Sequence, residues 1–140
     1  IIKKLRSKNY RVASIKHAHH DFDIDKPGTD SFKHRQSGAS EVIISSSKRW
    51  AKIIENNNKT EKKLNELLRE FIDVDLVIVE GFKNENHPKI EIIGQNSKIV
   101  NNEIKNVVAI VADQKTKSNI PLFMRNDVES LTEFIINKFL

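Results

Sequence analysis

DLVIVEGF, at residues 75–82, is a nearly continuous apolar run of strand length. Such a run is expected where both faces of a strand are covered, as in a parallel sheet between layers of helices. A second run of this kind, NVVAIVAD, occupies residues 106–113. The two runs predict an α/β fold with a mostly parallel sheet flanked by helices.

Helix and strand patterns alternate on both sides of these runs. Four apolar residues from Leu64 to Phe71 share one helical face, which predicts an amphipathic helix. Segments 89–94 and 97–101 alternate polar and apolar residues, which predicts an inserted β-hairpin. The other predicted elements are strands at residues 11–15 and 41–45 and helices at residues 1–6, 29–38, 46–55 and 127–140.

Polar residues and glycine mark the ends of these helices. Thr29 and Asp127 are the predicted N-caps, because their side-chain oxygens can accept from the free N–H groups of a first turn. Asn9 and Gly38 are predicted to end helices in the left-handed conformation. The sequence has no internal repeat and no linker, so residues 1–140 are predicted to form a single domain.

The composition excludes several classes of protein and site. The chain has 24 Lys and Arg against 19 Asp and Glu, a formal charge of +5, and no cysteine. Without cysteine there is neither a disulfide framework nor a thiolate metal site. The lysines are scattered among acids, so we expect no nucleic-acid partner. No apolar run reaches the roughly 18 residues of a membrane span, and we expect a soluble, cytoplasmic protein.

The segment IKHAHHDFDIDKPGTDSFKHR, at residues 15–35, combines four histidines, four aspartates and a Pro-Gly turn directly after a predicted strand. Carboxylate oxygens suit Mg²⁺. The imidazoles of His17 and His19, on one side of an extended segment, suit zinc or nickel. From the residues alone three interpretations stay open: a transition-metal site, a loop for a nucleotide and its magnesium, or a solvated loop.

Polar residues also follow both apolar runs. Glu80 and Gly81 stand at the end of the first run, and Asp113 ends the second. In an open parallel sheet, ligands bind beyond the carboxyl ends of the strands. A carboxylate there can hold Mg²⁺ through water, and Gly81 lets backbone approach a phosphate closely. The alternative is an acid that faces solvent beside a turn glycine.

Three segments, IKHAHHDFDIDKPGTDSFKHRQSGA, DLVIVEGFK and HPKIEI, resemble the molybdopterin-guanine dinucleotide biosynthesis protein B (MobB) family in the family's own order. The resemblance covers essentially the whole chain. It implies a P-loop NTPase-like fold and a GTP-binding adaptor that assists formation of molybdopterin guanine dinucleotide, with slow GTP hydrolysis in the complete protein. The implied ligands are GTP, Mg²⁺ and molybdopterin. The implied partners are the molybdenum cofactor guanylyltransferase, molybdenum-insertion proteins and a second copy of the chain.

The chain departs from the family in its phosphate loop. No sequence of the form G-x-x-x-x-G-K-[ST] occurs, and the predicted helix at residues 1–6 has no N-cap before it. The resemblance places a first strand and this loop upstream, in roughly 15 to 25 residues. We therefore expect the chain as given to bind GTP poorly, because the cradle for the β- and γ-phosphates is missing.

The resemblance also implies roles for single residues. Glu80 corresponds to the acidic position of the Walker B strand, and Asp25 is expected to join it in catalysis. The expected Mg²⁺ ligands are Asp23, Asp25 and Glu80. The expected contacts to the nucleotide or the pterin cofactor are His17, His19, His20, Asp30, Gly81, Lys83 and Asp113.

Two other functions stay open beside the GTP-binding adaptor. One is a non-catalytic interaction module, and the other is a metal-delivering GTPase that uses the histidines. In the predicted hairpin at residues 89–101, Ile90, Ile92 and Ile99 are among the alternating apolar residues. An unpaired hairpin edge invites pairing with a second copy. Together with the resemblance, this predicts a homodimer.

Overall fold

The computed structural model describes residues 1–18, 20–56, 60–94, 104–114 and 118–140. The chain divides into two compact units, one of Ile1–His17 with Leu64–Leu140 and the other of Ala18–Lys63. Within the described residues, no helix is long and apolar enough to cross a membrane. The single domain at residues 1–140 stays a prediction.

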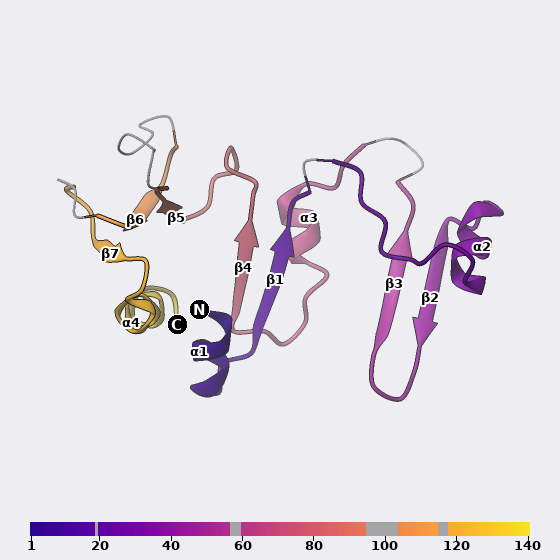
Figure 1. Ribbon diagram of the computed structural model, residues 1–140, viewed down its shortest axis with the longest axis horizontal. Coiled ribbons are helices and arrows are strands. Elements are labelled where there is room, and N and C mark those ends of the chain that lie inside the picture. The colour runs from indigo at the N-terminus through magenta and orange to yellow at the C-terminus, as the bar shows by residue number, and fades with distance from the viewer. Residues whose placement is uncertain (19, 57–59, 95–103, 115–117) are drawn as a thin grey trace. The chain divides into compact units, whose positions relative to one another are not determined.

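Two parallel strands form the first sheet of the larger unit (Figure 1). β1 (Val12–Lys16) and β4 (Leu76–Glu80) pair from Val12 opposite Leu76 to Lys16 opposite Glu80. Both strands lie where the sequence predicts them, within two residues at each end. β4 is half-buried, with Glu80 exposed, rather than fully buried on both faces. Among the described residues it pairs with β1 alone.

The second sheet of the larger unit has three parallel strands in the order β5-β6-β7. The central strand is β6 (Val107–Ala112), in which Ala109 and Ile110 are fully buried. It is flanked by β5 (Lys89–Ile92) and β7 (Leu122–Met124). The sequence does not predict β7, because three residues are too few to show a period. The second strand of the predicted hairpin, at residues 97–101, lies outside the described residues.

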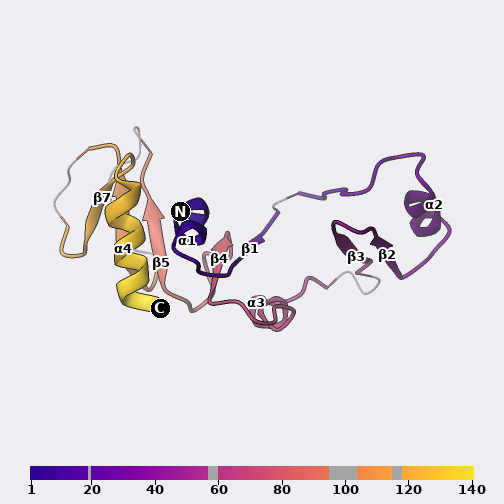
Figure 2. The same cartoon turned by 90° about the horizontal axis from the view of Figure 1, so that it is seen from below.

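The helix α4 (Val128–Phe139) packs beside this second sheet (Figure 2). Its Leu131 and Ile135, one turn apart, are buried with Val111 of β6 in one apolar cluster. Burying a side chain of this kind stabilises a fold by about 1.5–3 kcal/mol. Asp127 caps the helix as predicted, and its carboxylate accepts a hydrogen bond from a first-turn N–H at 3.1 Å.

The helix α1 (Ile2–Ser7) contacts α4 and buries Leu5 completely. Asn9 follows it at φ 68° and turns the chain toward β1, as predicted. The Nζ of Lys4 donates to a carboxylate oxygen of Glu129 on α4 at 2.5 Å. Both side chains are about half exposed, so this ion pair contributes little compared with the apolar contacts.

The helix α3 (Leu64–Leu68) is shorter than the predicted helix, which extends to Phe71. The N–H groups of residues 69–71 donate to carbonyls three residues earlier instead of four. This pattern is a 3₁₀-type tightening of the last turn. Asp73, at φ 58°, follows it in the left-handed region. The predicted helix therefore exists, but its predicted end is wrong.

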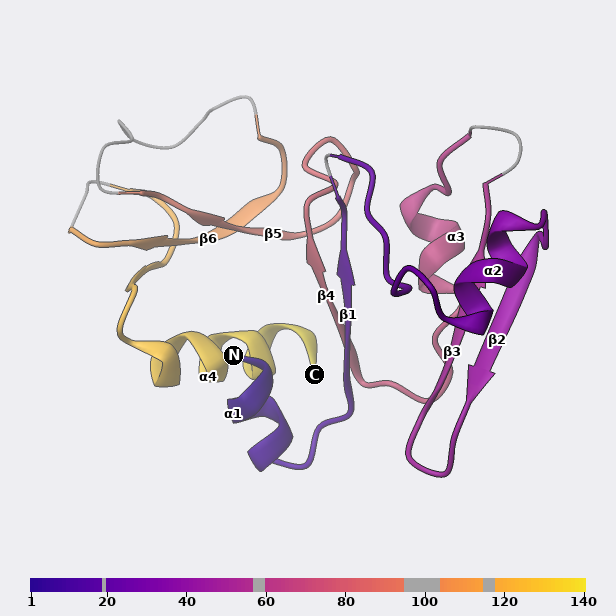
Figure 3. The ribbon, with the colours of Figure 1, turned by 45° about the vertical axis from the view of Figure 1, so that its right-hand side comes forward.

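The smaller unit consists of one short helix and a β-hairpin (Figure 3). The helix α2 (Asp30–Gln36) begins after Thr29, whose hydroxyl accepts from a backbone N–H of the first turn. Gly38, at φ 97°, follows its end. Both boundaries agree with the prediction. The hairpin joins β2 (Glu41–Ser45) and β3 (Trp50–Ile54) in antiparallel pairing.

The strand β3 shows that the predicted helix at residues 46–55 is wrong. The hydroxyl oxygen of Ser46 accepts from the backbone N–H groups of Lys48 and Arg49, which closes a tight turn after β2. The residues that follow include an aromatic side chain and two β-branched ones, types that pack better on a strand than in a helix. Pairing with β2 thus outweighs the helical spacing of the apolar residues.

Candidate functional site

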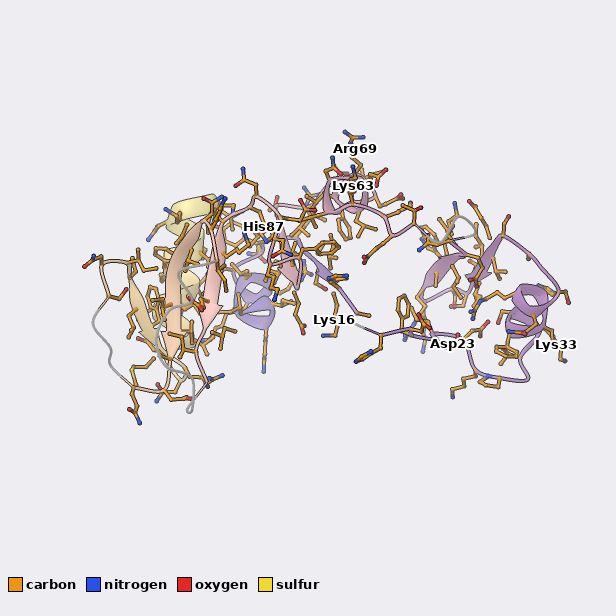
Figure 4. The ribbon with its side chains drawn as sticks, turned by 90° about the horizontal axis from the view of Figure 1, so that it is seen from above. Lys16, Asp23, Lys33, Lys63, Arg69 and His87 are labelled. Atoms are coloured by element: carbon orange, nitrogen blue, oxygen red, sulfur yellow. The ribbon has the colours of Figure 1, made fainter. Side chains whose placement is uncertain are left out.

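The parallel register of β1 and β4 brings basic and acidic groups together where the two strands end. Lys16 lies opposite Glu80, and its Nζ forms an ion pair with Glu80 Oε1 (Figure 4 labels Lys16). The backbone N–H of the next residue, His17, donates to the carbonyl of Glu80 at 2.8 Å. The expectation that residues following these strands share one edge of the sheet is confirmed for His17 and Glu80.

A left-handed turn follows β4 at this edge. Gly81 has a φ of 97° and Phe82 a φ of 50°. A Cβ atom built on Gly81 would lie 2.5 Å from the Cβ of His17, a separation that real Cβ atoms essentially never show. The rings of Phe82 and His17 stack, with centroids 4.4 Å apart and an interplanar angle of 19°. The absence of a side chain at Gly81 therefore allows these two rings to meet.

Charged groups at the edge of β1 and β4 are open to solvent. The side chains of Lys16 and Glu80 are 69% and 72% exposed, so their ion pair is worth little energy and can be exchanged. Lys83 is exposed in the turn after β4. A hard cation can replace Lys16 at the Glu80 carboxylate, and the released Lys16 ammonium can then bind an anion. The edge suits a ligand that carries an anionic group and a metal ion together.

A second carboxylate stands where β6 ends. Asp113 Oδ1 accepts from Arg125 Nε at 2.7 Å, and Arg125 Nη2 donates to the carbonyl of Ile93 at 3.0 Å. The hydrogen bond with Asp113 raises the pKa of Arg125. One guanidinium thereby joins the residues that follow β5, β6 and β7. The predicted binding residue Asp113 thus lies at the carboxyl end of the three-stranded sheet.

The acidic residues of the smaller unit make hydrogen bonds within that unit. Asp23 Oδ1 accepts from Arg35 Nη1 at 2.7 Å, and this hydrogen bond lowers the pKa of Asp23 (labelled in Figure 4). Asp25 Oδ1 accepts from the hydroxyls of Thr29 and Ser31, each at 3.1 Å. The other oxygen of this carboxylate, Asp25 Oδ2, is buried without a hydrogen-bond partner. It is an oxygen that a cation would satisfy.

The predicted magnesium ligands are divided between the two units. Asp23 and Asp25 belong to Ala18–Lys63, and Glu80 belongs to the larger unit. In the part of the chain that the structure describes, no three His, Cys, Asp or Glu side chains gather as a metal-binding group. Magnesium binding by these three carboxylates stays a prediction.

The remaining predicted residues lie in or near the segment before α2. His20 is exposed, and His19 lies outside the described residues. Asp30 is the first residue of α2 and forms an ion pair with Lys33 at 3.2 Å. None of these placements tests the predicted contacts to a nucleotide or a cofactor.

Three residues of these sites are missing from the prediction. Lys16 could have been found by aligning the ends of the two predicted strands, since in-register pairing sets it opposite Glu80. Phe82 carried a weak signal, because it follows a glycine at a strand end. No sequence pattern indicated Arg125, because β7, the three-residue strand before it, is too short to show a period.

Comparison with known proteins gives a consistent result. The family model of MobB, described as molybdopterin guanine dinucleotide synthesis protein B, matches residues 1–113. A molybdopterin-guanine dinucleotide biosynthesis adapter protein from Escherichia coli (strain K12) is 35% identical over 142 residues, which cover 97% of this chain and 81% of that protein. A Haemophilus influenzae protein of the same name is 34% identical over 140 residues, covering 98% and 78%.

Solved structures show the same fold. A crystal structure of molybdopterin-guanine biosynthesis protein B (mobB) superimposes with a TM-score of 0.77 at 27% identity, covering 97% of this chain and 84% of that one. The crystal structure of Bacillus subtilis MobB gives a TM-score of 0.74 at 19% identity, covering 99% and 86%. The predicted fold class, an α/β fold with parallel sheets flanked by helices, is confirmed.

Proposed function

Because the chain belongs to the family of molybdopterin guanine dinucleotide synthesis protein B, MobB, we propose that it is a GTP-binding adapter in the synthesis of molybdopterin guanine dinucleotide. The adapter role is supported by the relatives from Escherichia coli and Haemophilus influenzae, both named as adapter proteins of this biosynthesis. GTP binding, slow hydrolysis in the complete protein and the choice of partner are proposals that the family resemblance implies.

The observation that carries GTP binding is the shared edge of β1 and β4. Parallel strands place ligands at their carboxyl ends, and this edge holds an exchangeable Lys16–Glu80 pair beside a glycine turn. Triphosphate with Mg²⁺ combines the anion and the hard cation that such a pair can bind separately. We assign the phosphate contacts to His17, Gly81 and Lys83, with His19, His20 and Asp30 as further contacts to the nucleotide or the molybdopterin.

Magnesium belongs with the carboxylates in this proposal. Glu80 is exposed, and Asp25 has an oxygen that is buried without a hydrogen-bond partner. Arg35 lowers the pKa of Asp23 and already donates to this carboxylate, so a cation at Asp23 would share it with the guanidinium. When bound, Mg²⁺ neutralises phosphate charge. Glu80 would then orient the attacking water, and Asp113 would accept hydrogen bonds from the guanine base. Asp25 is a separate candidate for catalysis and for Mg²⁺ in the smaller unit.

The adapter role requires a surface for another protein, and the smaller unit supplies one. Ile43 and Trp50 lie on the same face of the β2–β3 hairpin and are 64% and 68% exposed. Large exposed apolar side chains that lie together are typical of protein interaction sites. We propose that this face binds the molybdenum cofactor guanylyltransferase or a molybdenum-insertion protein. The same observation favours the second candidate function, a non-catalytic interaction module.

Binding of the full-length protein to the guanylyltransferase, measured with and without nucleotide, separates the two functions. An adapter controlled by GTP should bind the immobilised enzyme about 10-fold more tightly with Mg²⁺ and GTP than without nucleotide. Equal affinity in both conditions would leave only the interaction module. Trp50→Ser should weaken binding in either case, whereas Ile72→Ser, at an 83% exposed position of the larger unit, is the matched control.

A further inference from the structure

Phe82 adopts a backbone conformation that bulky residues rarely take. Its φ of 50° lies in the left-handed region, next to Gly81 at 97°. Such conformations are strained and are found preferentially at functional sites. The strain at Phe82 must be offset by a contact that this turn creates.

That contact is the stack with His17. The two ring centroids are 4.4 Å apart and the planes differ by 19°, a stacked arrangement close to the short end of the separations that favourable aromatic pairs take. The backbone of His17 is fixed as well, because its N–H donates to the carbonyl of Glu80 at 2.8 Å. A side chain at Gly81 would collide with the Cβ of His17, so the glycine allows this close approach. The imidazole is thus held through its backbone and through its ring.

Packing in the core does not account for this arrangement. The apolar cluster of the larger unit is formed by Val111, Leu131 and Ile135, and Phe82 is not among the side chains packed against it. Phe82 and His17 are both half-buried, at an edge that also carries the exposed Lys16–Glu80 pair. The stack of Phe82 on His17 therefore lies outside this apolar cluster, beside charged groups.

We propose that Phe82 is a positioning residue, which holds the His17 imidazole in one orientation so that a ring N–H meets a phosphate oxygen of the ligand. The inference rests on the proposed GTP site and assigns Phe82 an action through His17 alone. A held donor binds more tightly than a mobile one, because its side-chain freedom is already lost before the ligand arrives.

Two measurements on the full-length protein test this role. The first is the NMR shift of the His17 ring protons at one fixed pH, which the stacked Phe82 ring displaces by its ring current. The second is the affinity for GTP with Mg²⁺. Phe82→Leu should abolish the displacement and weaken GTP binding about 3- to 10-fold, the value of an aromatic pair. Phe82→Tyr keeps a six-membered ring and should restore both.

Two further variants isolate the action through His17. In a His17→Gln background, Phe82→Leu should have no additional effect on GTP affinity, since a positioning residue has nothing left to position. Phe134→Leu is the matched control. It removes another aromatic pair, with Phe123 at 5.3 Å, and should lower stability without changing the His17 shift or GTP affinity.

The outcomes that contradict the inference are distinct. Unchanged GTP affinity in Phe82→Leu, or an equal loss from Phe82→Leu in the His17→Gln background, would overturn the positioning role. An unchanged shift of the His17 ring protons in Phe82→Leu would show that the two rings do not stack in the protein. A parent protein that binds no GTP would instead overturn the proposed function and the ligand named here, and would be recognised before any variant is compared.

Discussion

Glu80, Gly81 and Phe82 are three consecutive residues with three different constraints. The strand register places Glu80 opposite Lys16. A side chain at Gly81 would collide with His17, and the ring of Phe82 stacks on the His17 ring. The first two constraints follow from a strand and a turn, and the sequence predicts both residues as part of the site. The third depends on a contact between residues far apart in the chain, which no local pattern contains.

Substitution of Gly81 should be more damaging than substitution of other left-handed glycines. Gly81→Ala adds a methyl group 2.5 Å from the Cβ of His17, whereas a methyl at Gly38, at φ 97°, meets nothing within 4 Å. Gly38→Ala should cost about 1–2 kcal/mol for its backbone alone. Gly81→Ala should cost about 1–3 kcal/mol more in chemical denaturation. Equal losses of stability in the two variants would show that Gly81 and His17 can move apart to accept the methyl group.

Replacement of Glu80 should affect chemistry and leave the fold intact. Glu80→Gln removes a charge from an exposed pair, and we expect GTP hydrolysis by the full-length protein to fall about 10-fold or more at saturating Mg²⁺. Glu129→Gln is the matched control, because Glu129 is also an exposed partner of a lysine. Unchanged turnover in Glu80→Gln would remove this carboxylate from the mechanism.

At the scale of elements, the sequence predicts best where one local signal dominates. The caps at Thr29 and Asp127 form as predicted because a side-chain oxygen and a free N–H suffice. β3 is predicted wrongly as a helix, because the spacing of its apolar residues also fits a helix. Only the pairing with β2 determines that this segment is a strand. β7 is missed because its stability comes from β6 beside it rather than from its own three residues.

The smaller unit should be sensitive to acid through Asp23. Arg35 donates to Asp23 and to Glu55, each at 2.7 Å, and its side chain is only 15% exposed. The hydrogen bond from Arg35 lowers the pKa of Asp23 below its ordinary 3.8. A carboxyl with a lowered pKa stabilises the folded state fully above 3.8, and the contribution is lost as the pH falls through the folded value.

Unfolding followed by Trp50 fluorescence tests this dependence, since Trp50 is the single tryptophan of the chain and lies in this unit. The stability difference between the parent and Asp23→Asn should be constant from neutral pH to about pH 4 and should shrink below it. In an Arg35→Met background the same substitution should have little effect at any pH. A difference that grows with acid would contradict the assignment.

For the whole molecule, the fold class and the family follow from the sequence, whereas the division into two units does not. Alternating patterns predict a layered α/β fold, and the matches to MobB proteins confirm it. The division reflects which segments contact one another, and that information lies in pairings such as β1 with β4 across 64 positions of the chain. Local periodicity in the sequence does not indicate which distant segments pair with one another.

Homodimer formation stays a proposal, and sedimentation can test it. Among the described residues β5 is one of the two edge strands of its sheet, and Ile92 on it is 65% exposed. An exposed apolar edge favours pairing with a second copy. The full-length protein should sediment as a dimer at micromolar concentration, and Ile92→Lys should shift it toward monomer. Ile72→Lys, at another exposed isoleucine, should not.

Calorimetric titration of GTP into the full-length protein, with and without Mg²⁺, tests whether the edge of β1 and β4 is a nucleotide site. We expect about one GTP bound per chain, with affinity that depends on Mg²⁺ and falls in Glu80→Gln but not in Glu129→Gln. Absence of binding at saturating Mg²⁺, or binding that is indifferent to both the metal and Glu80, would contradict a nucleotide site at the edge of β1 and β4.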